Sequence, residues 1–201
     1  VGSPAGKDGR IAIYNSAGKR LRSFTAYSGK VGVNVAIADI DGDGSLEILA
    51  VPASASSAQV KIFDSQGQLK TKFLAADKRL VGGWSIGAGD LDGRGEARIV
   101  VGFGAGQEPQ VRIFNGSGNL LGVFLTYEKS FRGGVQVAVS DLYGRRNRSQ
   151  AQIIAVPGAG RETEVRIFDG HARLQKRFAA YNKNWLGGAN IAAGDLNNDC
   201  L

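Results

Sequence analysis

The chain repeats one pattern four times, and this repeat limits the fold more than any other feature. An aspartate that follows a strand of small apolar residues recurs at intervals of 51, 51 and 54 residues, as Asp39, Asp90, Asp141 and Asp195. An aromatic residue that ends an alternating strand recurs with nearly the same period, as Tyr14, Phe63, Phe114 and Phe168. A fixed period of about 50 residues means that one supersecondary unit has been copied along the chain.

Within each unit the hydrophobic period is two, which is the period of a β-strand. Segments such as VKIFD and VRIFN alternate apolar and polar residues and are followed by tight turns such as SQGQ and GSGN. The strand before the repeated aspartate and the strand after it, such as EILAVP and QIIAVP, are more continuously apolar, as inner strands are. Each unit therefore predicts four antiparallel strands, and the whole chain predicts an all-β fold, a β-propeller of four-stranded antiparallel blades.

The repeat register divides a single propeller domain, residues 1–201, into four units. They cover residues 31–79, 80–130, 131–184, and 185–201 together with 1–30. We expect a four-bladed ring in which the N-terminal and C-terminal segments complete one blade. The alternative is a fragment of a larger propeller with six to eight blades, and a homodimer is a third option because open blade edges invite pairing.

The first loop between inner strands, DIDGDGSLE, has the composition of a cation site. Asp39, Asp41 and Asp43 would supply carboxylates, Ser45 a backbone carbonyl and Glu47 a closing carboxylate. Calcium takes six to eight hard oxygen ligands, and a glycine permits the sharp turn that brings them together. A polar turn without metal is the alternative.

The other three loops have lost part of this pattern. In the second loop Arg94 and Arg98 stand where Asp43 and Glu47 stand in the first, and the third loop carries Tyr143 and Arg145 after its aspartate. The fourth loop keeps three oxygen-bearing residues and predicts a weaker site: Asp195, Asn197 and Asp199. Because the first aspartate persists where a metal is implausible, we expect its common role to be structural.

These segments also carry a resemblance to a known family. The elements VAIADIDGDGSLEILAV, GGWSIGAGDLDG and VRIFDGHARLQKRFAAY resemble the repeats called FG-GAP or VCBS, which occur in integrin α-subunit propellers and in many bacterial surface and secreted proteins. The resemblance extends over all four units. It implies a β-propeller whose loops between the first and second strands can hold Ca²⁺.

Composition narrows the classes of function. The net charge of +7 invites a nucleic-acid hypothesis, but the basic residues are spread along the chain, so we expect no nucleic-acid partner. No apolar run is long enough for a membrane span, and the single cysteine, Cys200, excludes an internal disulfide. The only histidine, His171, lies in a turn without the partners of a catalytic triad. We therefore expect no enzyme.

The function that these observations favour is a calcium-stabilised binding or adhesion module, extracellular or on the cell surface, with a protein or glycan ligand. One alternative is a lectin-like protein or a binder of anionic glycans that uses the basic loop or an exposed tryptophan; its candidate residues are Arg145, Arg146, Arg148 and Trp84. Trp185 is expected to pack between blades. The other alternative is a purely structural repeat segment of a larger surface protein.

Overall fold

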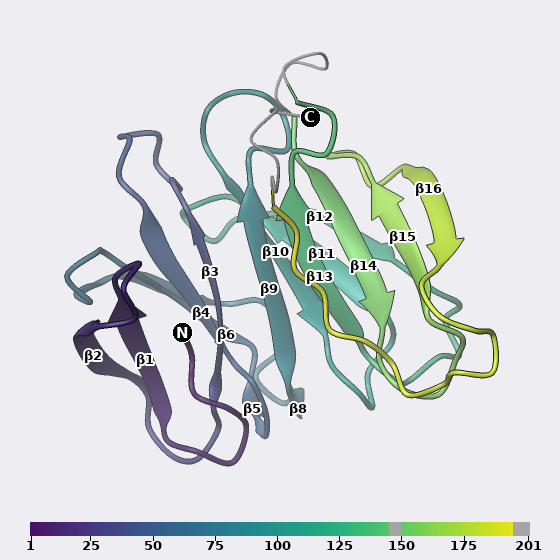
Figure 1. The fold of residues 1–201 in the computed structure, drawn as a ribbon, viewed down its shortest axis with the longest axis horizontal. Helices are drawn as coiled ribbons and strands as arrows, with labels where there is room; N and C mark the ends of the chain where they lie inside the picture. Colours follow the sequence, from purple (N-terminus) through teal and green to yellow (C-terminus); the bar gives the residue numbers. More distant parts are fainter. Residues whose placement is uncertain (145–149, 195–201) are drawn as a thin grey trace.

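The computed structural model describes residues 1–144 and 150–194. One two-stranded sheet and three four-stranded antiparallel sheets lie side by side in chain order across the molecule (Figure 1). The predicted propeller blades are thus confirmed, and no α-helix occurs in residues 1–144 and 150–194. It follows that this part of the chain contains no helix that could span a membrane.

Four sheets make up the described chain, and each keeps the strand order of the sequence. The N-terminal sheet pairs β1 (Gly9–Tyr14) with β2 (Arg20–Tyr27). The first blade consists of β3 (Val33–Ala38), β4 (Glu47–Pro52), β6 (Gln59–Phe63) and β7 (Leu69–Leu74). The second blade consists of β9 (Trp84–Gly89), β10 (Arg98–Phe103), β11 (Gln110–Phe114) and β12 (Leu120–Leu125). The third blade consists of β13 (Val135–Ser140), β14 (Gln152–Pro157), β15 (Glu164–Phe168) and β16 (Leu174–Ala179).

Burial within a blade follows the hydrophobic pattern of its strands. Every residue of the second strands β4 and β14 is buried, which explains their nearly continuous apolar sequences. The third strands, such as β6, alternate between buried and half-buried positions, and the outer strands β7 and β12 are largely exposed. A further short ladder, β5 (Ser56–Ser57) with β8 (Val81–Gly82), links the loops of the first and second blades.

The hairpin between the third and fourth strands has the same construction in every sheet. In the first blade the Asp64 side chain accepts hydrogen bonds from the backbone N–H groups of Gln66 and Gln68, both at 2.8 Å. Asn115 and Asp169 accept the equivalent bonds in the other blades. The carboxylate or amide thus replaces backbone partners in the turn. His171 is a residue of such a turn, where its own N–H donates to Asp169.

Neighbouring sheets contact each other through a repeated aromatic pair. A phenylalanine of the fourth strand packs against a phenylalanine of the third strand in the next sheet, with ring centroids about 5 Å apart at each junction; the pairs are Phe24 with Phe63, Phe73 with Phe114, and Phe124 with Phe168. Rings at this distance and tilt stabilise each other beyond the area that they bury. The fold is therefore a series of equivalent junctions.

A cation and a tyrosine complete these junctions. Lys61 of β6 donates to the Ala26 carbonyl oxygen of the N-terminal sheet at 2.7 Å, and Arg166 of β15 donates to the Thr126 carbonyl oxygen at 2.6 Å. The Tyr27 hydroxyl lies 2.7 Å from two carbonyl oxygens of the first blade, and Tyr127 makes equivalent contacts with the third blade. Sequence spacing alone had located these tyrosines but not their partners.

Trp84 belongs to the junction between the first and second blades. Its side chain is 1% exposed, its indole N–H donates to the Ser56 carbonyl oxygen at 2.9 Å, and its ring meets Phe103 edge to face. The prediction of a ligand-binding Trp84 is wrong, because this indole fills the space beside Ala76, where the other two described junctions place a tyrosine.

Trp185 also differs from its prediction. It is 52% exposed and lies against Tyr181, whereas its counterpart Phe131 packs on Tyr127 within the junction of the second and third blades. The predicted junction residue lacks a following sheet among the described residues, which leaves the indole in solvent.

The C-terminal segment occupies the position of a first strand. Ala189 and Ile191 pack against the buried face of the third blade, as Val135 and Val137 pack against the second blade. Residues 189–194 form no ladder in the described chain, and no backbone hydrogen bond there joins residues 1–14 to residues 187–194. A four-bladed ring closed by the two termini therefore stays a prediction.

Candidate functional site

The loop between β3 and β4, residues 39–46, is organised around the carboxylate of Asp39. One Asp39 oxygen accepts the Gly42 N–H at 2.8 Å, and the other accepts the Gly44 N–H at 2.9 Å. Both glycines have positive φ, 76° and 84°, a conformation that L-residues with a side chain rarely adopt. The glycines of the motif are thus required by the turn, and Asp39 holds the turn closed.

Three carboxylates converge in this loop. Oxygens of Asp39, Asp41 and Asp43 all lie within 4.8 Å of one another, and the Asp41 and Asp43 side chains are exposed to solvent. Asp43 also accepts the Ser45 N–H at 2.7 Å, which fixes its direction. Hard oxygens grouped on a short loop are the ligands that Ca²⁺ prefers. The three aspartates therefore fit a divalent cation that is open to water on one side.

Glu47 does not join this group, although the sequence motif predicts it as the closing ligand. The glutamate is almost fully buried; one carboxylate oxygen accepts the Ile40 N–H at 3.0 Å and the other accepts a bond from Lys70 at 2.9 Å. In the third blade Gln152 accepts the Leu142 N–H in the same way. A side-chain oxygen here is therefore part of the loop's internal bonding, and calcium binding by Glu47 stays a prediction.

Lys70 of β7 is the residue of this site that sequence reasoning missed. Its ammonium group bridges Asp41 at 2.8 Å and Glu47 at 2.9 Å. Its hydrogen bond to Asp41 lowers the pKa of that carboxyl group, and the two carboxylates raise the pKa of Lys70. A signal was present, because the same offset carries Leu21, Leu121 or Gln175 in the other units. The only cation at this offset accompanies the complete acidic loop.

The second and third loops keep the structural aspartate and lose the cation site. The Asp90 carboxylate accepts the N–H groups of Gly93 and Gly95, both at 2.8 Å, and Asp141 accepts the Gly144 N–H at 2.9 Å. In the second loop Arg98 donates to Asp92 at 2.8 Å. Burial tends to raise the pKa of Asp92, but the bond and charge of Arg98 outweigh it and lower that pKa. A guanidinium group thus stands where a metal ion would need a carboxylate.

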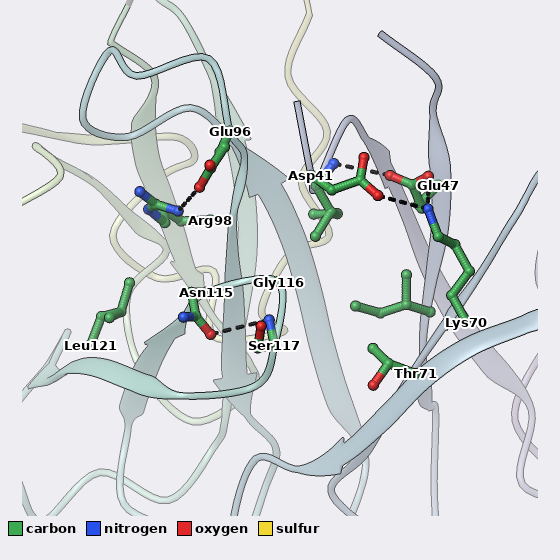
Figure 2. Close-up of a pocket in the computed structure, with 12 residues that line it drawn as sticks. Asp41, Glu47, Lys70, Thr71, Glu96, Arg98, Asn115, Gly116, Ser117 and Leu121 are labelled. Atoms are coloured by element: carbon green, nitrogen blue, oxygen red, sulfur yellow. Dashed lines mark hydrogen bonds and ion pairs between the residues drawn. The ribbon is translucent and has the colours of Figure 1, made fainter. Parts of the chain in front are cut away.

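A pocket of about 520 Å³ lies between the first two loops. Figure 2 shows Asp41, Glu47 and Lys70 on one side of it, with Glu96 and Arg98 across from them. The β11–β12 turn forms a further wall, and the apolar part of the lining comes from Ile40, Ile62 and Leu121. Asp41 belongs both to the aspartate group and to the pocket, so a cation in the loop would lie at the pocket rim.

The remaining predicted site residues lie outside the described part of the chain. These are the weaker metal ligands of the fourth loop, Asp195, Asn197 and Asp199, and the basic cluster of Arg145, Arg146 and Arg148. Their predicted roles remain predictions.

Comparison with solved structures shows the propeller fold. A structure titled exotype rhamnogalacturonan lyase YesX is 17% identical and superposes with a TM-score of 0.54; the match covers 88% of this chain and 36% of that one. A protein of unknown function from Bacteroides caccae is 18% identical, with a TM-score of 0.51 and coverages of 90% and 59%. A structure titled Dos1 propeller is 16% identical, with a TM-score of 0.51 and coverages of 87% and 42%.

The chain therefore spans between about a third and three-fifths of the length of these proteins. Identities this low show a shared fold and leave activity open. No family model and no curated protein matches the chain. Membership of the FG-GAP or VCBS family accordingly stays a prediction, although the propeller that the resemblance implied is present.

Proposed function

We propose that this chain is a non-catalytic binding module, extracellular or on the cell surface, whose first loop holds Ca²⁺ beside a ligand pocket. The observation that carries the proposal is the position of Asp41. Its carboxylate belongs to the group of three aspartates within 4.8 Å and also lines the pocket of about 520 Å³. A pocket of this size is within the usual range for small-ligand sites.

Calcium would be held by the carboxylates of Asp39, Asp41 and Asp43, with the Ser45 carbonyl oxygen as a further ligand. The ion would neutralise three neighbouring negative charges and fix the loop that forms the pocket rim. An open site with few protein ligands has modest affinity, in the range of about 0.1 to 1 mM that is typical of extracellular modules. This range supports an extracellular or surface location, where free calcium is high enough to fill the site.

The lining of the pocket supports a glycan with many hydroxyl groups as the ligand. Its charged groups are three carboxylates and two cations, and each carboxylate is already paired with Lys70 or Arg98. Paired ions held in place can accept and donate hydrogen bonds to hydroxyl groups, while the excess negative charge disfavours a polyanion. Ile40, Ile62 and Leu121 offer apolar surface to the faces of a sugar ring.

The same pairing supports a non-catalytic role. A general acid or base needs a carboxyl group that can exchange its proton near neutral pH. In the described part of the chain, the pocket carboxylates are all bound by a lysine or an arginine, and His171 lies in the β15–β16 turn, outside the residues that line the pocket.

Calorimetric titration with CaCl₂ tests the cation. We expect a single site in the high-micromolar to millimolar range, lost in Asp43→Asn and retained in Asp64→Asn. Asp64 is a matched control, because asparagine already forms the equivalent turn at Asn115. Absence of binding in the wild-type chain, or equal binding in both variants, would disprove the calcium site.

A glycan array in calcium-containing buffer tests the ligand, with Ser117→Trp as the variant. Ser117 is exposed at the pocket wall, so tryptophan fills the pocket without entering the core. Binding of neutral glycans that Ser117→Trp abolishes would support the proposal. Binding of anionic glycans alone, lost at high salt, would favour the alternative basic-loop site. No glycan signal would contradict a glycan ligand.

A further inference from the structure

The two ends of the described sheet series carry the two halves of the blade junction, and both halves are exposed. At each internal junction a fourth-strand phenylalanine meets a third-strand phenylalanine of the next sheet. The next copy of the fourth-strand residue is Phe178, and the first copy of the third-strand residue is Tyr14. Each is 47% exposed. The series therefore presents an unused aromatic ring at either end.

The end of the third blade, which we name the trailing face, has the full set of junction residues. It comprises Phe178, Tyr181 and Trp185. Tyr181 occupies the position of Tyr27 and Tyr127, which are 7% and 3% exposed and bond to carbonyl oxygens of the next sheet. Tyr181 is 56% exposed. The trailing face thus has the chemistry that binds a further sheet at the other junctions.

The N-terminal sheet offers the complementary surface, the leading face, formed by Tyr14 and Gly18. Ile11 and Ile13 of β1 point toward the first blade, which places Tyr14 on the opposite side, as Phe63 is opposite Ile62. The turn glycines Gly67 and Gly118 receive a phenylalanine of the preceding sheet; a Cβ atom on Gly118 would lie 2.8 Å from the Cβ atom of Phe73.

Gly18 has the same turn conformation as these two glycines, with φ of +74°, and open space where their phenylalanines lie. The leading face therefore has room for one aromatic side chain at the place where Phe178 would arrive.

We infer that the trailing face of one copy binds the leading face of a second copy, so that two chains join head to tail. Phe178 would pack on Tyr14 and Gly18 of the other copy, as Phe24 packs on Phe63 and Gly67 within the chain. Residues 189–191, already placed as a first strand, would lie beside the N-terminal sheet of that copy. Contacts of this kind close into a ring when the rotation per subunit permits. Two such contacts close a ring of two copies.

A second copy is favoured over the same copy by the arrangement of the sheets. Figure 1 shows β1 and β2 at one side of the molecule and β15 and β16 at the other. The half-exposure of Tyr14 and Phe178 shows that the two faces do not cover each other within one chain.

Sedimentation equilibrium over a range of concentrations tests the inference. We expect twice the chain mass of 21.1 kDa for the wild type. Phe178→Ser should shift the protein to monomer, with an increase of at least about tenfold in the dissociation constant, as for loss of a buried aromatic anchor. Leu74→Ser is the matched control, since Leu74 is 45% exposed on β7, away from both faces, and should leave the dimer intact. A wild type that stays monomeric or forms open polymers would overturn the inference.

Disulfide trapping distinguishes a second copy from the same copy. Cys200→Ser removes the native thiol, and Gly18→Cys and Phe178→Cys are introduced into separate chains. Ala172 occupies the equivalent turn position in the third blade, so a side chain is tolerated there. Oxidation should yield covalent dimers only from the mixture of the two variants. Dimers formed as readily by either variant alone, or a cross-link within one chain carrying both cysteines, would refute the head-to-tail pair.

Discussion

Single residues hold neighbouring sheets together where a side-chain hydroxyl reaches across a junction. Tyr27 is 7% exposed, and its hydroxyl group lies between the carbonyl oxygens of Ala50 and Gln59. Burial raises the pKa of Tyr27 above its ordinary value, because the phenolate would lose its hydration. The neutral hydroxyl is therefore the form that the fold stabilises.

Tyr27→Phe should lower the free energy of unfolding by about 1 to 2 kcal/mol at neutral pH. Because the folded pKa is raised, the stabilisation is fully present below about pH 10 and is lost as pH rises above that value, when the unfolded chain releases the proton. Urea denaturation at about pH 7 and about pH 11 measures both effects. Tyr14→Phe is the control, with an exposed hydroxyl. Equal stability of wild type and Tyr27→Phe at neutral pH would contradict this role.

Lys70 competes with a cation for the same carboxylate. Its ammonium group lies 2.8 Å from an Asp41 oxygen, and a divalent ion in the aspartate group would be repelled by it. Lys70→Met should therefore raise the calcium affinity by about tenfold. Titration calorimetry measures the change, with Lys72→Met, two residues further along β7, as the control. A lower calcium affinity in Lys70→Met would show that the lysine organises the site instead of opposing it.

At the scale of strands and turns, the period-two pattern was sufficient to place the blades. The alternation in VKIFD and VRIFN gave third strands, and the apolar runs EILAVP and QIIAVP gave fully buried second strands. The two tryptophans were misjudged for one reason. Whether a large side chain is buried depends on the sheet beside it, and the sequence does not show that Trp84 takes the space left beside Ala76. Glu47 was misassigned because Lys70 comes from a strand further along the chain.

The β15–β16 turn contains a test of turn geometry. Ala172 has φ of 61°, whereas the other hairpins of this type have a glycine at that position: Gly18, Gly67 and Gly118. Ala172→Gly should raise the free energy of unfolding by about 1 kcal/mol, since glycine adopts this backbone conformation without steric cost. Chemical denaturation measures the change. Ala17→Gly, in a turn residue without positive φ, should be neutral or destabilising; a gain of stability there and none at Ala172 would contradict the explanation.

At the scale of the whole molecule, the sheets form a series whose members repeat one junction, and the described ends stay open. The repeat predicted this series, because each unit can bury its faces only against its neighbours. How many blades make the ring did not follow from the repeat, since the rotation between adjacent sheets is set by packing that the period does not encode. The equivalent positions of Phe24, Phe73, Phe124 and Phe178 nevertheless show which face lacks a partner.

Calcium should stabilise the folded chain as a whole, because the loop aspartates converge only in the native state. At about ten times the dissociation constant, binding adds about 1.4 kcal/mol to the free energy of unfolding. This corresponds to a rise of a few degrees in Tm, which thermal melting in CaCl₂ and in EDTA measures. Asp43→Asn should show no difference between the two buffers; a wild type with the same Tm in both would contradict calcium stabilisation.

The most direct test of the central claim is a crystal structure in calcium-containing buffer with anomalous scattering data. The account predicts one ion peak within about 2.3 to 2.6 Å of carboxylate oxygens of Asp39, Asp41 and Asp43, at the rim of the pocket between the first two blades. No peak in this loop, with the Lys70 ammonium group still bridging Asp41 and Glu47, would contradict it.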